Sequence, residues 1–188
     1  MSIAPTDTAL VQAAQRGDRG AFGVLVARHA AAVLSVTMRM LGPADAEDAA
    51  QDTFVAAFTA LARFKQEAKF STWLYRIAVN KCHDRLRARR AADVSLDDEQ
   101  DDAGWEPPDD ETPHWELEQS EMAEAIERGI QALPPLYRES FVLRHVEGLD
   151  YDEMSAILDA PRDTVKMRVY KARGLLCRAL AHLSGACR

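Results

Sequence analysis

The sequence predicts an all-α protein with two helical domains joined by a flexible acidic linker. Apolar residues recur every three or four positions across most of 10–92 and 119–183, which is the spacing of amphipathic helices. Runs rich in Val, Ile and Thr, which are typical of strands, are almost absent. The stretch between the two helical ranges, 93–118, contains three prolines and no apolar periodicity. These observations divide the chain into 1–92, 93–118 and 119–188.

The charge of the chain is strongly segmented. The 188 residues carry a formal net charge of -7, which excludes a protein that binds polyanions through its overall charge. However, residues 63–92 hold 9 basic and 2 acidic side chains, and 162–188 hold 7 basic and 1 acidic. The spacer 93–118 holds 12 acidic side chains and no basic one. Two basic blocks around an acidic spacer indicate local contacts with nucleic acid.

The acidic spacer cannot bury enough apolar surface to offset the entropy of ordering it, so we expect a flexible linker. It is either a plain tether or a mimic of nucleic-acid charge that occupies a basic face or channel. Trp105 and Trp115 lie within it and favour some docking.

The first domain begins with a long predicted helix, which Asp18 is suited to cap and Gly42-Pro43 to end. Its apolar stripe comprises Phe22, Leu25, Val26, His29, Val33, Val36 and Met40. A second helix is expected from about Ala44, and its buried stripe comprises Ala50, Phe54, Ala57, Phe58 and Leu61.

Asp45, Asp48 and Asp52 share another face of the second helix. One interpretation is favourable negative charge near a helix N-terminus. The other is a docking surface for a basic partner, because three aligned carboxylates exceed what capping needs.

A third helix is expected to begin near Ser71 or Thr72, both usable N-caps, with Trp73, Ile77 and Leu86 facing inward. The preceding loop, 63–70, interleaves aromatic and basic side chains. This composition suits single-stranded nucleic acid, although Phe64, Phe70 and Trp73, taken individually, fit a core better than a base-stacking surface. Asn80 lies one turn beyond Arg76, where it either reads a base edge or bonds solvent.

The second domain contains the most specific pattern in the chain. Two amphipathic helices come first, one with Met122, Ala125, Ile126 and Ile130 inward, and one over about 137–146 with Phe141, Val142 and His145 inward. After Gly148, a short helix over 151–158, a turn at 159–161 and a longer helix over 162–173 predict a helix-turn-helix.

In this helix-turn-helix, Met154, Ile157 and Leu158 are expected to face Val165, Val169, Ala172 and Leu176. The opposite face then presents Asp163, Met167, Tyr170 and Gly174, flanked by Lys166 and Lys171. Such a face suits the major groove, because lysine reaches guanine acceptors and apolar side chains reach thymine methyl groups. Arg162 and Arg173 would contact phosphates. An ordinary solvated helix face is the alternative.

Several motifs together resemble the extracytoplasmic-function (group IV) sigma factors of bacterial RNA polymerase. They are Gly17-Asp18 with Ala21-Phe22, then Asp45 to Phe54, Phe70 to Lys81, Leu133 to Glu139 and Thr164 to Arg173. The resemblance covers nearly the whole chain outside the linker. It implies that 1–92 forms a sigma-2 domain and 119–188 a sigma-4 domain.

The resemblance also implies roles for individual residues. Docking on core RNA polymerase falls to Asp45, Glu47, Asp48, Gln51 and Asp52. Contacts with the minus-ten DNA fall to Phe64, Lys65, Lys69, Phe70, Trp73, Asn80 and Lys81. Contacts with the minus-thirty-five DNA fall to Arg138, Arg162, Thr164, Lys166, Met167, Tyr170, Lys171 and Arg173. The expected partners are core RNA polymerase, double- and single-stranded promoter DNA, and an anti-sigma factor.

Three positions depart from the family pattern. The family often has Gly where Asp159 and Asp163 stand, and Ser at the position of Met167. Asp159 can still adopt a left-handed turn. Asp163 would repel phosphate unless it caps the helix or accepts from a cytosine amine.

No catalytic triad, phosphate loop or metal-binding motif is present, so we expect a binding protein without catalytic residues, cofactor or metal. No stretch approaches the length of a membrane span, and Met1 to Leu10 lacks the features of a signal peptide, which predicts a cytoplasmic protein without membrane insertion. The alternatives are a two-domain regulator whose helix-turn-helix acts alone and a protein-binding helical adaptor.

Overall fold

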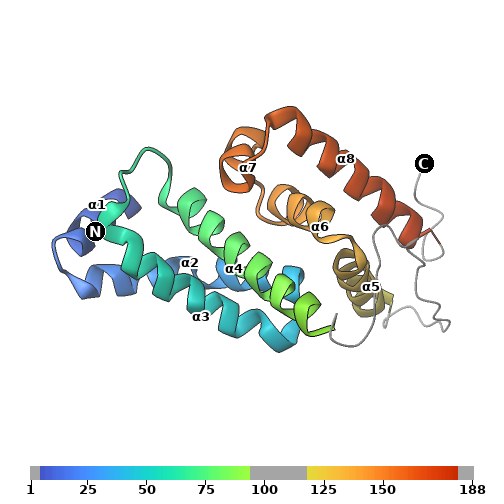
Figure 1. The fold of residues 1–188 in the computed structure, drawn as a ribbon, viewed down its shortest axis with the longest axis horizontal. Coiled ribbons are helices and arrows are strands. Elements are labelled where there is room, and N and C mark those ends of the chain that lie inside the picture. Colours follow the sequence, from blue (N-terminus) through green and yellow to red (C-terminus); the bar gives the residue numbers. More distant parts are fainter. Residues whose placement is uncertain (1–4, 94–117, 182–188) are drawn as a thin grey trace.

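The computed structural model describes residues 5–93 and 118–181, and this part of the chain is helical (Figure 1). The first four helices are α1 (Asp7–Gln15), α2 (Arg19–Leu41), α3 (Pro43–Ala60) and α4 (Phe70–Asp93), with a 3-10 turn at Leu61–Arg63. The other four are α5 (Glu118–Ala132), α6 (Pro135–Phe141), α7 (Tyr151–Leu158) and α8 (Arg162–Ala179). The predictions about the acidic linker, Trp105 and Trp115 lie outside the described residues.

The ends of α2 follow the capping residues of the sequence. The Asp18 carboxylate accepts a hydrogen bond from the backbone N–H of Ala21 at 3.1 Å, as an N-cap does. Gly42 ends the helix with φ 79°, a conformation that favours glycine, and Pro43 opens α3 directly afterwards. By contrast, α4 begins at Phe70, so the prediction of an N-cap at Ser71 or Thr72 was wrong: both residues lie inside the first turn.

The first domain has a core of its own, formed by α1 to α4. Its buried members include Leu10, Phe22, Leu25, Val33, Leu61, Phe70 and Leu74. Phe58, expected in this core, is 47% exposed and packs edge-on against Phe22. On α4 the buried face is rotated from the expected one, because Leu74, Ala78 and Val79 are buried whereas Ile77 and Leu86 are only half-buried.

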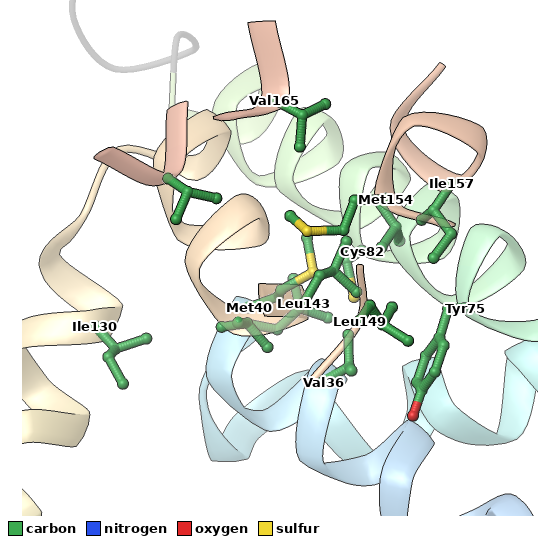
Figure 2. Close-up of a cluster of buried hydrophobic side chains, with 14 of the residues drawn as sticks. Val36, Met40, Tyr75, Cys82, Ile130, Leu143, Leu149, Met154, Ile157 and Val165 are labelled. Atoms are coloured by element: carbon green, nitrogen blue, oxygen red, sulfur yellow. The ribbon is translucent and has the colours of Figure 1, made fainter. Parts of the chain in front are cut away.

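A second core is shared between the two halves of the molecule (Figure 2). From the first domain it takes Val36, Met40, Tyr75, Val79 and Cys82. From the second it takes Ile130, Leu143, Leu149, Met154, Ile157 and Val165. The sequence leads one to expect an independent core in each domain. Instead, the helix-turn-helix domain buries its inner face partly against α2 and α4.

One helix passes a length and hydropathy test for a membrane span. Within the described residues, α2 is 23 residues long and contains an 18-residue window with a mean hydropathy of 1.6, so the expectation that no stretch approaches a span was wrong in length and hydropathy. Its apolar residues instead supply both cores, through Leu25 and Val33 in one and Val36 and Met40 in the other. In this fold α2 is a packing helix.

The second domain deviates from regular α-helix just before the helix-turn-helix. After α6 the chain continues as one π-helical segment, Val142–Val146, which leaves His145 exposed although it was expected to face inward. Gly148 then ends the helical conformation with φ 69°. Asp150 then caps α7 in a capping box with Glu153, and Asp159 ends α7 in the left-handed conformation at φ 48°, as the sequence allowed.

The packing of α2 makes a testable prediction. Leu25 is fully buried, so Leu25→Ala leaves a cavity and should lower the free energy of unfolding by about 2–5 kcal/mol. The adjacent Val24 is 44% exposed, and Val24→Ala should change it by less than about 0.5 kcal/mol. Urea unfolding followed by circular dichroism measures both, and equal effects would contradict the assigned orientation of α2.

Candidate functional site

The acidic face of α3 lies beside basic residues of α4. Arg85 contacts the carboxylates of Asp52, Asp45 and Asp48, at 2.8, 3.7 and 3.9 Å. Arg89 forms a further ion pair with Asp45. The hydrogen bond to Asp52 raises the pKa of Arg85. The aspartates therefore repel one another less than their sequence spacing suggests.

Much of this acidic face stays open to a partner. Asp48 is 70% and Asp52 53% exposed, whereas Asp45 is 28% exposed. Glu47 and Gln51 are also exposed on α3. The face thus combines free acidic surface with a rim of arginines from α4.

A pocket of about 380 Å³ lies between the 63–70 loop and α4. Arg63, Lys65 and Arg76 contribute cations to its lining. Phe64 and Trp73 contribute aromatic rings, which stack with their centroids 4.7 Å apart. A cationic pocket with aromatic faces suits an unstacked base next to its phosphate.

The predicted minus-ten residues lie in three places: at the pocket and its loop, in the core behind it, and further along α4. Lys65 and Lys69 are exposed, Phe64 and Trp73 are half-buried, and all but Lys69 line the pocket. Phe70 is 4% exposed and belongs to the core of the first domain, so its ring supports the site from behind. Asn80 is exposed and Lys81 half-buried, both further along α4.

Gln15 positions the 63–70 loop, a role that the sequence did not predict. Its side-chain amide donates hydrogen bonds to the backbone carbonyls of Leu61 and Phe64, both at 2.9 Å. These bonds tie the start of the loop to the end of α1. A single polar residue on a short helix gives no local signal of such a contact.

The outer face of α8 has the predicted arrangement. Tyr170 is 73% and Met167 55% exposed, and Thr164, Lys166, Lys171 and Arg173 are exposed with them. Val165, Val169, Ala172 and Leu176 are buried on the opposite side. Arg162 pairs with Asp152 at 3.1 Å, so it borders this face. The exposed combination of cations, a methionine and a tyrosine fits the edges of base pairs in a major groove.

Arg138 is held by backbone carbonyls in this structure. Its guanidinium donates to the carbonyls of Met40 at 2.6 Å and Leu133 at 2.9 Å, and also bonds that of Gln131. Burial, and secondarily the charge of Arg89, lowers the pKa of Arg138. Arg138, which was expected to contact DNA, is therefore bound in this arrangement by backbone carbonyls at the ends of α2 and α5.

A cationic group near the start of the helix-turn-helix was not anticipated. The Arg144 guanidinium lies 4.8 Å from the centre of the Tyr151 ring and donates to the carbonyl of Leu149. Partial burial lowers the pKa of His145, and the charges of Arg173 and Arg144 lower it further. Positive charge thus accumulates beside the exposed face of α8.

The fold defines a class of protein: a helical protein with a cationic, aromatic pocket in one half and a helix-turn-helix in the other. Comparisons with known proteins narrow the class. The family model of sigma-70 region 2 matches residues 25–92, and that of sigma-70 region 4 matches 123–183.

The ECF RNA polymerase sigma-E factor of Haemophilus influenzae is 36% identical over 176 residues, covering 91% of this chain and 93% of that protein. The sigma-E factor of Escherichia coli K12 is 36% identical over 178 residues, covering 92% and 93%.

Solved structures agree with these matches. CnrH in complex with the cytosolic domain of CnrY superposes with a TM-score of 0.68 at 32% identity, covering 95% of this chain and 99% of that one. The sigma factor RpoE of Bartonella quintana, in complex with the anti-sigma factor NepR, gives the same TM-score at 21% identity, covering 89% and 98%, which shows the shared fold. The chain belongs to the extracytoplasmic-function sigma factors, which are promoter-specific initiation factors of transcription.

The carbonyl contacts of Arg138 predict a structural role. Arg138→Ala leaves several carbonyls without a donor and should lower the free energy of unfolding by about 1–3 kcal/mol. Arg178→Ala, at an exposed position of α8, is the control and should leave it nearly unchanged. Urea unfolding compares the two, and an unaltered midpoint for Arg138→Ala would show that these bonds contribute nothing.

Proposed function

We propose that this sigma factor uses the two faces described above to bring core RNA polymerase to a promoter. In this proposal 1–92 is the sigma-2 domain, which docks on polymerase and binds minus-ten DNA. Residues 119–188 are the sigma-4 domain, which reads minus-thirty-five DNA, and 93–118 connect them. The observation that carries the proposal is the pairing of a cationic, aromatic pocket with an exposed recognition helix in one chain.

Docking on polymerase is assigned to the open part of the acidic face. Asp48, Asp52, Glu47 and Gln51 are accessible, and Asp45 lies at the rim with Arg85 and Arg89. A basic partner surface would compete with Arg85 for the same carboxylates. Docking would therefore exchange ion pairs within the chain for ion pairs with the polymerase, at a modest net free energy.

Minus-ten binding is assigned to the pocket and its approach. Phe64 and Trp73 offer stacking surfaces to an unpaired base, and Lys65, Lys69 and Lys81 supply phosphate contacts. Asn80 lies on the exposed side of α4, where its amide can read a base edge. Such contacts favour a melted strand over duplex, because only unpaired bases can stack on protein aromatics.

Minus-thirty-five binding is assigned to the outer face of α8. Lys166, Met167, Tyr170 and Lys171 face the bases, and Arg162, Thr164 and Arg173 face the phosphates. Arg138 joins the phosphate contacts only if its carbonyl bonds are released. The factor acts inside the cell with the transcription machinery, which we assign to the cytoplasm, and it works by binding and not by catalysis.

We also propose control by an anti-sigma factor. The 32% identical CnrH is bound in its structure by the cytosolic domain of another protein, CnrY. The acidic face of α3 is the accessible docking surface that a protein partner would share with the polymerase. Occupation of that surface would prevent assembly with polymerase without any contact with DNA.

Run-off transcription tests the proposed function. The purified chain, added to purified core polymerase and a template library from its own genome, should give promoter-dependent transcripts that neither component gives alone. Asp48→Lys/Asp52→Lys, which reverses charge at two exposed positions, should reduce both these transcripts and co-purification with core polymerase. Absence of any promoter-dependent product would refute the assignment.

Asn80→Ala separates DNA melting from polymerase docking. Because Asn80 is exposed, replacing its side chain should leave the stability of the fold and binding to core polymerase unchanged. Open-complex formation should weaken by about tenfold, which corresponds to the loss of one hydrogen bond to a base together with its neighbouring contacts. Permanganate reactivity of unpaired thymines reports the open complex. Asp84→Ala, one turn further along α4, is the control, and equal loss of core binding and melting in Asn80→Ala would contradict the assigned role.

A further inference from the structure

The helix-turn-helix half packs directly onto the minus-ten half. Met154 and Ile157 of α7 are buried in the same cluster as Tyr75 and Val79 of α4 and Met40 of α2. Figure 2 shows Met154, Ile157, Cys82 and Leu143 converging on the centre of this cluster, with Tyr75 at its edge. Burial of these side chains removes apolar surface from water at the centre of the contact between the halves, which is the main stabilising contribution to such packing.

Polar contacts fix the register of the two halves. The Glu147 carboxylate accepts hydrogen bonds from Ser35 of α2 at 2.9 Å and from the Tyr75 hydroxyl of α4 at 2.5 Å. Burial, and then the hydrogen bond to Glu147, raises the pKa of Tyr75, so this hydroxyl remains a donor at all physiological pH values. Glu147 precedes Gly148 and α7, so it anchors the entry to the helix-turn-helix.

Two further polar contacts cross between the halves. Arg39 of α2 pairs with Glu127 of α5 at 2.6 Å. His83 of α4 bonds Glu139 of α6, whose side chain is 2% exposed, at 2.5 Å. Together with the bonds of Glu147, these contacts join α2 and α4 of the first half to three different segments of the second.

The same packing reaches the base-binding pocket. Ala156 of α7 lines the pocket together with Trp73 and Arg76 of α4. Lys69, at the end of the pocket loop, pairs with Glu153 of α7 at 2.7 Å, and this hydrogen bond raises its pKa. The outer face of α8 stays exposed meanwhile, since Met167 is 55% and Tyr170 73% exposed. The contact thus obstructs only one of the two DNA faces.

We propose that the chain by itself occupies a closed, autoinhibited state, latched by Glu147 on Ser35 and Tyr75, in which α7 supplies one wall of the minus-ten pocket and engages Lys69 while the outer face of α8 stays exposed. This inference rests on the proposed function for the meaning of the pocket. Opening requires the latch and the shared core to separate, and binding of core polymerase supplies the free energy. Apparent affinity for single-stranded DNA is then reduced by the fraction of molecules that are open.

Cys82 is a built-in reporter of opening. It is fully buried in the shared core, and burial raises the pKa of its thiol to about 12. Alkylation requires an accessible thiolate, so Cys82 reacts only when the halves separate. A Cys177→Ser/Cys187→Ser background leaves it as the single thiol of the chain.

The experiment measures iodoacetamide alkylation of Cys82 by mass spectrometry, with and without core polymerase. The closed chain should react far more slowly than the urea-unfolded chain, and core polymerase should accelerate the reaction. Tyr75→Phe removes only the hydroxyl donor to Glu147 and should accelerate it about tenfold, because a hydrogen bond to a charged group is lost. Tyr151→Phe removes a hydroxyl that makes none of the described interdomain bonds, and should leave the rate unchanged.

Two further measurements keep the test specific. The Tyr75→Phe rate should depend on urea less steeply than global unfolding does, since opening exposes only the shared core. Binding of a short single-stranded oligothymidylate should tighten by the same factor as alkylation accelerates. Equal rates for the two tyrosine variants, a urea dependence matching global unfolding, or unchanged oligothymidylate binding would each overturn the closed state.

The outcomes also separate this inference from the proposed function. A reactive Cys82 in wild-type protein, together with successful run-off transcription, would overturn the closed state alone. A protected Cys82 together with failed run-off transcription would overturn the proposed function, and with it the assigned meaning of the pocket, while leaving the closed packing of the two halves in place. Alkylation that core polymerase does not accelerate, in a reaction that gives transcripts, would overturn release by polymerase.

Discussion

The buried face of α4 is the surface on which both halves of the molecule are built. Leu74 and Ala78 belong to the core of the first domain, whereas Tyr75, Val79 and Cys82 belong to the core shared with the second. One helix therefore serves two cores through neighbouring stripes of the same face. Any rotation of α4 would disturb the pocket at its start and the interdomain contact along its length.

This shared helix links the chemistry of the two halves. Trp73 and Arg76 line the pocket, and Tyr75 between them in sequence bonds Glu147 of the other half. Arg85 and Arg89, further along, pair with Asp52 and Asp45 of the acidic face of α3. The pocket, the Tyr75–Glu147 contact and the arginines beside the acidic face of α3 thus lie on successive turns of one helix, which offers a short physical route for coupling between them.

The fold also decides how much of the positive charge remains exposed. The net charge of -7 would disfavour DNA binding if it were evenly spread, yet the exposed face of α8 and the rim of the pocket are cationic. Several other basic side chains are already paired, including Arg39, Arg85 and Lys69, and Arg138 is bound to carbonyls. The number of basic residues in a segment therefore overstates the positive charge that this arrangement offers to DNA.

Local pattern was sufficient for much of the molecule. Asp18 and Gly42 bounded α2, and the apolar spacing of 151–176 located the helix-turn-helix and its exposed face, because caps and helical periodicity act within a few residues. The pairing of Glu147 with Tyr75, the carbonyl cage of Arg138 and the burial of Phe70 were decided only by tertiary structure. An apolar stripe specifies that a face is buried and not what buries it, and partners separated by tens of residues leave no periodic trace in the sequence.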